Sequence, residues 1–463
     1  MDTLTAPVSD EILVRHLDDM ADRYACYPGT AHFDPGFTDV EFGNAIRSSN
    51  GDLIPHRLSL HVAVPQAFQA CFCGDCRPLA SRDRSRSGAY LDRLVREIAL
   101  VGGLCDRDRD VAQLTLAPGA LTLFDAAQLG ELLESMSRNF HVPRGGKRDF
   151  AVTLDPHGTR PPGLRALVDL GFNRASFALQ EAGSWEGGGE GDAPCTDLLG
   201  LVEACRAAGL GCVRVDLLFG TPRQGLADVE ALISQTVETR PDRIAIRDCA
   251  HLPESFHLGN QPCPQRSEPA ERASMLAAAY RALIAAGYLH VGMDLFALPH
   301  DPLVGASRSG QLYRDALGFG THGETDLLGF GVGAISQIGG AYCQSSPRLR
   351  RWEAAIDAGR CAVQHGLFLT EDDLARADIV QALTCHGRLD TRLIEHRHSL
   401  DFGVYFAPDL VRLDPLLRDG LAAWEGSSLV LSSSGRLLSR IVAACFDRYL
   451  HQPAMTVQLR AQP

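Results

Sequence analysis

The chain has 463 residues, of which 45% are hydrophobic, and a formal net charge of −13. Its length supports a large core divided into a main domain and a smaller one, and the acidic balance without any basic run argues against a nucleic-acid partner. Its fourteen cysteines are scattered and no apolar segment approaches the roughly 18 residues of a transmembrane helix, so we expect a protein of the reducing cytoplasm without membrane insertion.

The N-terminal region begins with a predicted amphipathic helix at residues 9–20, capped by Ser9 or Asp10. The loop that follows contains Tyr24, Tyr27 and Pro28. This composition predicts a segment that lies either over a pocket or simply against the surface of the protein.

Strands and helices then alternate from residue 58 onward. This rhythm indicates βαβ units and therefore a parallel sheet covered by helices. Six or seven such units favour a barrel, complete or partial, in which functional residues lie at the carboxyl ends of the strands. The predicted strands are 58–64, 111–116, 150–154, 174–178, 211–217, 243–248 and 289–293, and the helices are 88–101, 126–139, 162–170, 196–209, 226–238 and 268–287.

Three cysteines, Cys71, Cys73 and Cys76, follow the first predicted strand within six positions. Thiolates this close can converge on one soft metal centre, which favours an iron–sulfur cluster. The alternative is a chance grouping of buried thiols, because a free cysteine packs as a small hydrophobic residue. The Cys-x-Cys-x2-Cys spacing is standard neither for zinc nor for iron–sulfur clusters, so both interpretations stay open on the motif alone.

Polar or small residues also follow the other predicted strands. Gly119 lies in the turn after the second strand, Gln180 follows the fourth, Asp216 lies on the fifth, and Ala250 follows the sixth. Gln180 and Asp216 are candidates for hydrogen bonds to the ribose hydroxyls of a bound nucleoside. A solvated loop or a helix cap is the alternative for each residue taken singly.

The pattern changes after residue 297. Residues 308–320 are expected to be irregular, and residues 321–336 form a glycine-punctuated loop whose glycines suggest close approach to a ligand or to a neighbouring strand. Thr370 and Asp373 start a run of predicted helices at 371–384, 400–407, 408–419 and 435–449, with a two-stranded wing at 421–424 and 429–431. The acidic balance favours a lid or docking domain over a nucleic-acid reader. We therefore divide the chain into 1–57, with the N-terminal helix and a substrate-side loop, 58–300, the barrel, 301–365, a glycine-rich connection, and 366–463, the helical winged domain.

The order of several motifs resembles the radical S-adenosylmethionine family of oxygen-independent coproporphyrinogen III dehydrogenases. The resemblance covers nearly the whole chain and is carried by Tyr24-x2-Tyr27-Pro28, Gly171-Phe172-Asn173-Arg174, Asp216-Leu-x2-Gly220, Ala250-His251-Leu252-Pro253, Gly287-Tyr288 and Gly292-Met293-Asp294. It implies a partial (β/α)6-type radical-SAM barrel, of the α/β class, with a C-terminal mainly helical, winged-helix-like domain. It also implies a monomer that oxidatively decarboxylates the tetrapyrrole coproporphyrinogen III to protoporphyrinogen IX in haem biosynthesis.

The resemblance further implies a [4Fe-4S] cluster and two molecules of S-adenosylmethionine. Carried over by position, Gly119, Gln180, Asp216 and Ala250 correspond to contacts with the second molecule, and Ile335 corresponds to a contact with the first.

The chain departs from the family pattern around the cluster and the first S-adenosylmethionine. The family motif Cys-x3-Cys-x2-Cys places its first cysteine on Ala67 and its second on Cys71, whereas Cys73 is one residue early for the third and Cys76 matches an extra, non-ligating cysteine. His61 replaces a tyrosine, Thr153 replaces a glutamate that pairs with the amino group, and Pro118 interrupts a glycine loop.

Three hypotheses follow. The first is an active dehydrogenase whose cluster is held by Cys71, Cys73 and Cys76. The second is a cluster-deficient paralogue that binds porphyrinogen or haem as a carrier or regulator, with His61 as a possible axial ligand, although a lone histidine is more often simply packed. The third is a structural partner of an active family member.

Overall fold

The structure is a computed structural model of the chain. It describes residues 4–19, 24, 26–64, 86–143, 149–154, 161–179, 198–221, 224–251, 257–258, 261–262, 267–323 and 325–451. The predicted cluster ligands Cys71, Cys73 and Cys76 and the predicted nucleoside contact Gln180 lie outside these residues. Within them, no helix is both long and apolar enough to cross a membrane.

Six parallel strands, adjacent in chain order, form the centre of the fold and confirm the predicted α/β class. The predicted bounds of the second and sixth strands agree with the structure, and the others differ by one or two residues at an end. The strands are β1 (Arg57–Val62), β2 (Val111–Leu116), β3 (Asp149–Leu154), β4 (Arg174–Leu179), β5 (Cys212–Phe219) and β6 (Arg243–Asp248).

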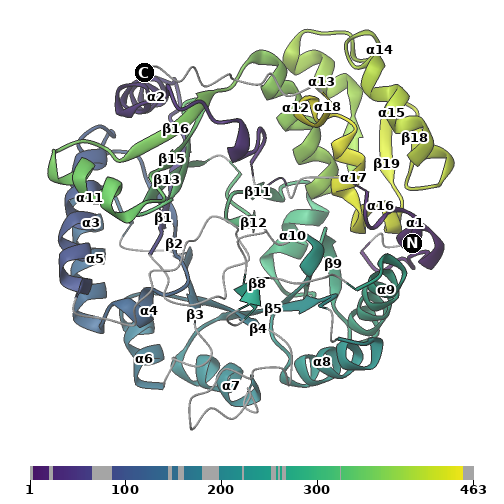
Figure 1. The fold of residues 1–463 in the computed structure, drawn as a ribbon, viewed down its shortest axis with the longest axis horizontal. Helices are drawn as coiled ribbons and strands as arrows, with labels where there is room; N and C mark the ends of the chain where they lie inside the picture. Colours follow the sequence, from purple (N-terminus) through teal and green to yellow (C-terminus); the bar gives the residue numbers. More distant parts are fainter. Residues whose placement is uncertain are drawn as a thin grey trace.

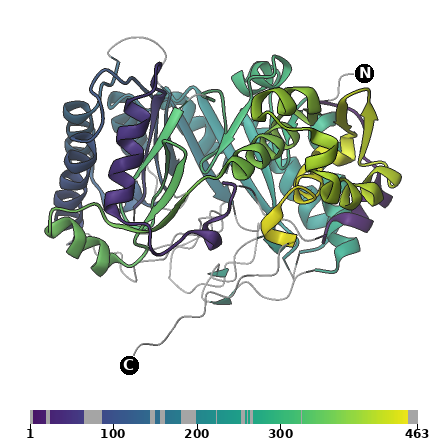
Figure 2. The same ribbon diagram turned by 90° about the horizontal axis from the view of Figure 1, so that it is seen from above.

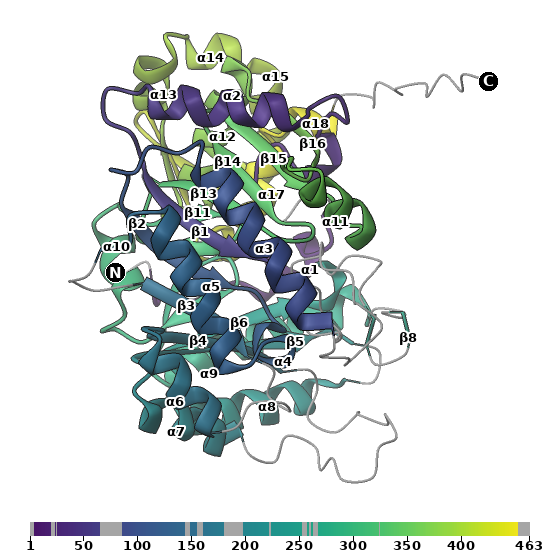
Figure 3. The same ribbon diagram turned by 90° about the vertical axis from the view of Figure 1, so that its left-hand side faces the viewer.

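Helices cover the outer face of this curved sheet, as Figure 1 shows. Their side chains join those of the strands in one large apolar core. Helix α5 shows how local sequence starts a helix, because Asp125 and Gln128 form a reciprocal capping box at its first turn. The helices are α3 (Ser87–Gly102), α4 (Ala120–Leu123), α5 (Ala126–Asn139), α6 (Pro161–Asp169), α7 (Leu198–Ala208), α8 (Leu226–Thr239) and α9 (Pro269–Ala285), and Figure 3 shows α3 and α5 side by side on this face.

The sheet continues beyond β1 with strands from the segment that the sequence analysis treated as loop. The loop expected over residues 321–336 was wrong, because β13 (Thr325–Phe330) is a fully buried strand that pairs in parallel with β1. Its glycines allow close packing, since a Cβ on Gly329 would lie 2.3 Å from the carbonyl oxygen of Ile335. The expected close approach of these glycines to a neighbouring strand, here β14 (Ile335–Ile338), is confirmed. The other elements here are α10 (Pro302–Arg308), β11 (Tyr313–Asp315), β12 (Gly318–Gly320), β14 (Ile335–Ile338), β15 (Ala341–Ser345), α11 (Leu349–Asp357) and β16 (Val363–Phe368).

The opposite end of the sheet also differs from the prediction. The predicted seventh strand is β9 (Leu289–Gly292), which pairs with β10 (Leu295–Ala297) in an antiparallel hairpin at the edge, and β10 pairs antiparallel to β6. Two residues between β9 and β10 are too few for a parallel crossover. The result is an open, twelve-stranded sheet in the order β16-β15-β14-β13-β1-β2-β3-β4-β5-β6-β10-β9.

The C-terminal region is mainly helical and carries the predicted hairpin, β18 (Ala422–Glu425) with β19 (Ser428–Leu431), which β17 (Arg388–Asp390) extends to three strands. Its helices are α12 (Glu371–Gln381), α13 (Thr391–His398), α14 (Phe402–Tyr405) and α15 (Ala407–Arg418). The prediction of a single helix at 435–449 is wrong. The chain forms α16 (Ser433–Leu437), α17 (Ser439–Ala444) and α18 (Arg448–His451), because Asp447 accepts the backbone N–H groups of Tyr449 and Leu450 and starts a new turn.

The N-terminal segment links the two regions. Helix α1 (Asp10–His16), capped by Ser9, is shorter than predicted and packs on α9. Helix α2 (Asp39–Asn50) packs against β14 and β15. Figures 1 and 2 show the C-terminal helices at the side of the molecule that carries α1 and α9, across from α2 and α3.

Candidate functional site

The two faces of the parallel strands differ in chemistry. Leu60, Leu114 and Phe150 line a common space with Leu133 and Met136 of α5, so this face of the sheet packs on the helices. Because side chains alternate along a strand, the intervening residues project to the inner face. The inner residues are mostly polar: His61 on β1, Thr115 on β2, Thr153 on β3, Ser176 on β4, Arg214 and Asp216 on β5, and Arg247 on β6. The enclosed face of the sheet is therefore the candidate site.

His61 places an unsatisfied polar atom on this inner face. Part of the residue is accessible, but its Nδ1 atom is buried and has no hydrogen-bond partner among the described residues. Burial lowers the pKa of His61 to about 4, and the backbone of Thr115 offsets this only in part. The imidazole is thus neutral at physiological pH. The proposed axial-ligand role of His61 stays a prediction.

The loop after β2 contains the predicted contact Gly119. Its φ of +92° places it in the left-handed region, where glycine is favoured, and the single turn α4 starts directly after it. Pro118, next to it, has no N–H group, and Ala120 is fully buried. This loop therefore offers a ligand fewer backbone donors than the glycine loop that the resemblance implies.

Asp216 is engaged by two arginines. Its carboxylate lies 2.5 Å from Nε of Arg214 and 3.5 Å from Arg247, and Arg247 also pairs with Asp294 in the turn between β9 and β10. A ribose hydroxyl would have to share this carboxylate with both guanidinium groups. Sequence reasoning missed the two arginines, although Arg214 lies two residues before Asp216 and hence on the same strand face.

Ala250 and Ile335 lie at the same edge of the sheet as Gly119. Ala250 belongs to the 3-10 turn Cys249–His251 after β6, and its N–H donates to the carboxylate of Asp248 at 2.8 Å. Ile335 starts β14, directly after the turn that follows β13. The structure thus places these predicted residues at or near the carboxyl edge of the parallel strands, and their roles as ligand contacts stay predictions.

A buried polar cluster lies beside Ala63, the residue that follows β1. Glu97 accepts hydrogen bonds from the backbone N–H of Gly331 at 2.7 Å and from Nε1 of Trp352 at 3.1 Å. The hydroxyl of Tyr90 donates to the carbonyl of Ala63 at 3.0 Å. Burial raises the pKa of Glu97 to about 7. Nothing in the sequence pattern indicated this cluster, because its members lie far apart in the chain.

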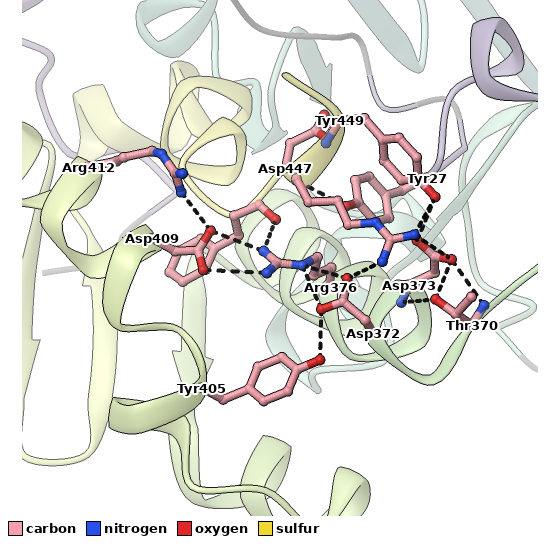
Figure 4. Close-up of polar contacts among 12 residues, drawn as sticks. Tyr27, Thr370, Asp372, Asp373, Arg376, Tyr405, Asp409, Arg412, Asp447 and Tyr449 are labelled. Carbon is pink, nitrogen blue, oxygen red and sulfur yellow. Dashed lines mark hydrogen bonds and ion pairs between the residues drawn. The ribbon is translucent and has the colours of Figure 1, made fainter. Parts of the chain in front are cut away.

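The N-terminal tyrosine loop lies against the C-terminal helices rather than on the outer surface. Tyr24 donates to Asp447 at 3.1 Å, and the hydroxyl of Tyr27 accepts the N–H of Arg448. Burial raises the pKa of Tyr27 above its ordinary range. Figure 4 shows an ionic network beside Tyr27 that includes Asp372, Arg376 and Asp409. Arg376 lies 3.0 Å from Asp409, and Arg448 lies 2.6 Å from Asp372. This network anchors the loop on the C-terminal domain, and a substrate contact for the loop stays a prediction.

The described residues do not fit the first S-adenosylmethionine molecule that the resemblance implies. Thr153 stands at the position of the carboxylate for the amino group, and its hydroxyl is already hydrogen-bonded to Ser176 at 3.0 Å. Within the described ranges, no group of three His, Cys, Asp or Glu side chains is placed to hold a metal ion. Cys71, Cys73 and Cys76 lie outside those ranges.

The chain is similar over nearly its full length to several known proteins of one name. The oxygen-independent coproporphyrinogen III oxidase of Pseudomonas aeruginosa is 34% identical over 450 residues, covering 95% of this chain and 96% of that protein. The protein of the same name from Escherichia coli K12 is 33% identical, with 97% of each chain covered. The solved structure of coproporphyrinogen III oxidase from Escherichia coli, described as a radical SAM enzyme, matches with a TM-score of 0.81 and 31% identity over 92% of this chain and 97% of that one. No family model matches the chain.

Proposed function

We propose that this chain, which belongs to the family of oxygen-independent coproporphyrinogen III oxidases, binds a coproporphyrinogen-type tetrapyrrole at the inner face of its sheet without running the family's radical step. The observation that carries the binding proposal is the match of fold, at a TM-score of 0.81, to the solved coproporphyrinogen III oxidase. The inner face supports it with polar and cationic side chains, which suit a macrocycle that bears propionates. A monomer in the cytoplasm, without a nucleic-acid partner, is part of the same proposal.

The second part of the proposal rests on the altered residues. An ammonium group that loses its carboxylate partner forgoes a charge-assisted hydrogen bond worth roughly 1.5–3 kcal/mol. Thr153 supplies no charge, its hydroxyl being hydrogen-bonded to Ser176, and Pro118 supplies no N–H. Together these changes weaken S-adenosylmethionine binding by orders of magnitude relative to a site with all partners.

A second candidate function is the oxidative decarboxylation of coproporphyrinogen III, with a cluster held by Cys71, Cys73 and Cys76. The observation that favours it is the place of these cysteines in the chain, because they follow Val64, which lies at the carboxyl edge of the parallel strands, where active sites of such sheets lie. When bound, a [4Fe-4S] cluster with S-adenosylmethionine supplies a radical that the side chains of the protein cannot generate.

Two measurements separate the candidates. Titration of the purified chain with coproporphyrin III, the stable oxidised form of the macrocycle, followed by porphyrin fluorescence, tests binding, and we expect saturable binding. Anaerobic reconstitution with iron and sulfide, followed by assay of 5′-deoxyadenosine, tests the radical step, and we expect none. Absence of coproporphyrin binding contradicts the proposal, and formation of 5′-deoxyadenosine establishes the second candidate instead.

A further inference from the structure

A small cavity lies where the carboxyl ends of β5 and β6 meet α17. Its volume is about 60 Å³, and its lining includes Phe219 of β5, Ile246 of β6 and Leu437 and Leu438 beside α17. A space of this size holds a carboxylate group and not a macrocycle. Three guanidinium groups also line it, those of Arg247, Arg314 and Arg440.

Among the described side chains that line this cavity, three guanidinium groups outnumber two carboxylates. Of the two lining carboxylates, Asp294 pairs with Arg247, and Asp248 lies 3.3 Å from Nε of Arg272. Arg314 donates to the backbone carbonyl of Tyr24, with its guanidinium 5.7 Å from the centre of the Phe319 ring, and makes no ion pair within the described part of the chain.

Arg440 is the unusual member of this group. Its side chain is 9% exposed, and across the ranges that the structure describes it makes neither a hydrogen bond nor an ion pair. Asp248 and Asp294 act on it only at longer range, and although burial lowers the pKa of Arg440 to about 10, the group is still charged at neutral pH. Burying an unpaired guanidinium destabilises a fold, so its presence beside a cavity points to a ligand that supplies the missing charge.

We propose that Arg440, with Arg314 beside it, binds a carboxylate of the ligand in this cavity, and that the carboxylate is a propionate of the tetrapyrrole. The planar guanidinium suits a carboxylate because it can donate two parallel hydrogen bonds to its two oxygens. Arg247 extends from the inner face of β6 and also lines the cavity, so the cavity adjoins the face where the macrocycle is proposed to lie. The inference rests on the proposed function for the identity of the ligand.

The carboxylate of S-adenosylmethionine could bind the two arginines in the same way as a propionate of the tetrapyrrole. The experiment therefore has to distinguish these two ligands. The test variant is Arg440→Met, which keeps an unbranched side chain comparable to the aliphatic part of arginine and removes the guanidinium group and its charge. The control is Arg418→Met, which removes an exposed arginine from the same C-terminal domain. Each full-length protein is titrated with coproporphyrin III, with its tetramethyl ester and with S-adenosylmethionine.

We expect Arg440→Met to weaken coproporphyrin III binding about tenfold or more, to bind the ester as the unaltered chain does, and to unfold at a temperature a few degrees higher. A gain in thermal stability excludes misfolding as the cause of lost binding. Equal affinity of the variant and the unaltered chain for coproporphyrin III overturns the inference. Weakened binding of S-adenosylmethionine alone overturns the assignment to a propionate.

Inorganic phosphate separates failure of this inference from failure of the proposed function. Phosphate raises the unfolding temperature of the unaltered chain, and not of Arg440→Met, if the anion site exists. If the unaltered chain binds no coproporphyrin but still shows this phosphate effect, the proposed function fails while the anion site stands. If phosphate stabilises both proteins equally, the site itself is refuted.

Discussion

Thr153 and Ser176 are hydrogen-bonded to each other at 3.0 Å across β3 and β4, at the position where the family resemblance places a carboxylate. Two hydroxyls that satisfy one another leave no anionic acceptor for an ammonium group. This hydroxyl pair lies on the inner face of the sheet, at positions far in sequence from Cys71, Cys73 and Cys76.

Asp216 should contribute strongly to stability. Replacing it in Asp216→Asn leaves Arg214 and Arg247, both mostly buried, without their shared carboxylate, so we expect a loss of about 2–4 kcal/mol in the free energy of unfolding. Urea denaturation measures the change. The matched control is Glu425→Gln, whose pair with Arg388 is more than half exposed and should change stability by less than about 1 kcal/mol. Equal effects of the two substitutions contradict the account of Asp216.

Glu97 should make stability depend on pH. Its folded pKa of about 7 lies above the ordinary value of 4.5, so the folded state holds the proton more tightly than the unfolded state does. Its stabilising contribution is complete below pH 4.5 and is lost as pH rises through 7, by roughly 3 kcal/mol in total. Urea denaturation between pH 4 and 8 measures this loss when the unaltered chain is compared with Glu97→Gln, which cannot titrate. If the difference in the free energy of unfolding between the two proteins does not change with pH, the prediction is contradicted.

The same carboxyl group should also be needed for its two hydrogen bonds at acidic pH, where the folded state keeps it neutral. Glu97→Gln turns an amide nitrogen toward one of its two donors, Gly331 or Trp352, and should cost about 1–3 kcal/mol at pH 5. Trp352→Phe removes the indole N–H that donates to Glu97. The stability losses of the two substitutions should therefore be non-additive, because both break the same hydrogen bond. A double-mutant cycle measures the coupling, and additive effects are inconsistent with the hydrogen bond.

His61 should serve binding at the expense of stability. Its buried Nδ1 atom has no partner, so His61→Phe should raise the free energy of unfolding by about 1 kcal/mol and weaken coproporphyrin III binding. If haem is a ligand and His61 coordinates its iron, the Soret band should shift relative to free haem in the complex with the unaltered chain and not in the complex with this variant. A destabilised variant with unchanged affinity indicates a packed histidine without a ligand role.

Cys71 distinguishes the two candidate functions. The proposed function predicts that Cys71→Ala and the unaltered chain retain equal, low iron after anaerobic reconstitution and bind coproporphyrin III equally. A cluster held by Cys71, Cys73 and Cys76 predicts that only the unaltered chain retains iron, since a missing thiolate removes a ligand. Iron analysis of the two proteins decides between them.

The parallel half of the sheet was predictable because β1 to β6 carry local signals, namely apolar alternation and a helix of adequate length between strands. Strand β13 was not, because glycines such as Gly329 serve loops and close strand packing equally well. The sequence places Gly119, Asp216 and Ala250 at strand ends, but it could not show that Asp216 is shared by two arginines. It also could not show that Arg440 lies beside β6 without an ion pair among the described residues, since contacts between distant segments exist only after folding.

The most direct test of binding without the radical step is one anaerobic incubation of the reconstituted full-length chain with coproporphyrinogen III and S-adenosylmethionine. Porphyrins are then extracted from the protein fraction, oxidised and quantified by chromatography. The account predicts coproporphyrin recovered with the protein in stoichiometric amount and no protoporphyrin. Protoporphyrin in the extract, or a protein fraction without any porphyrin, would contradict it.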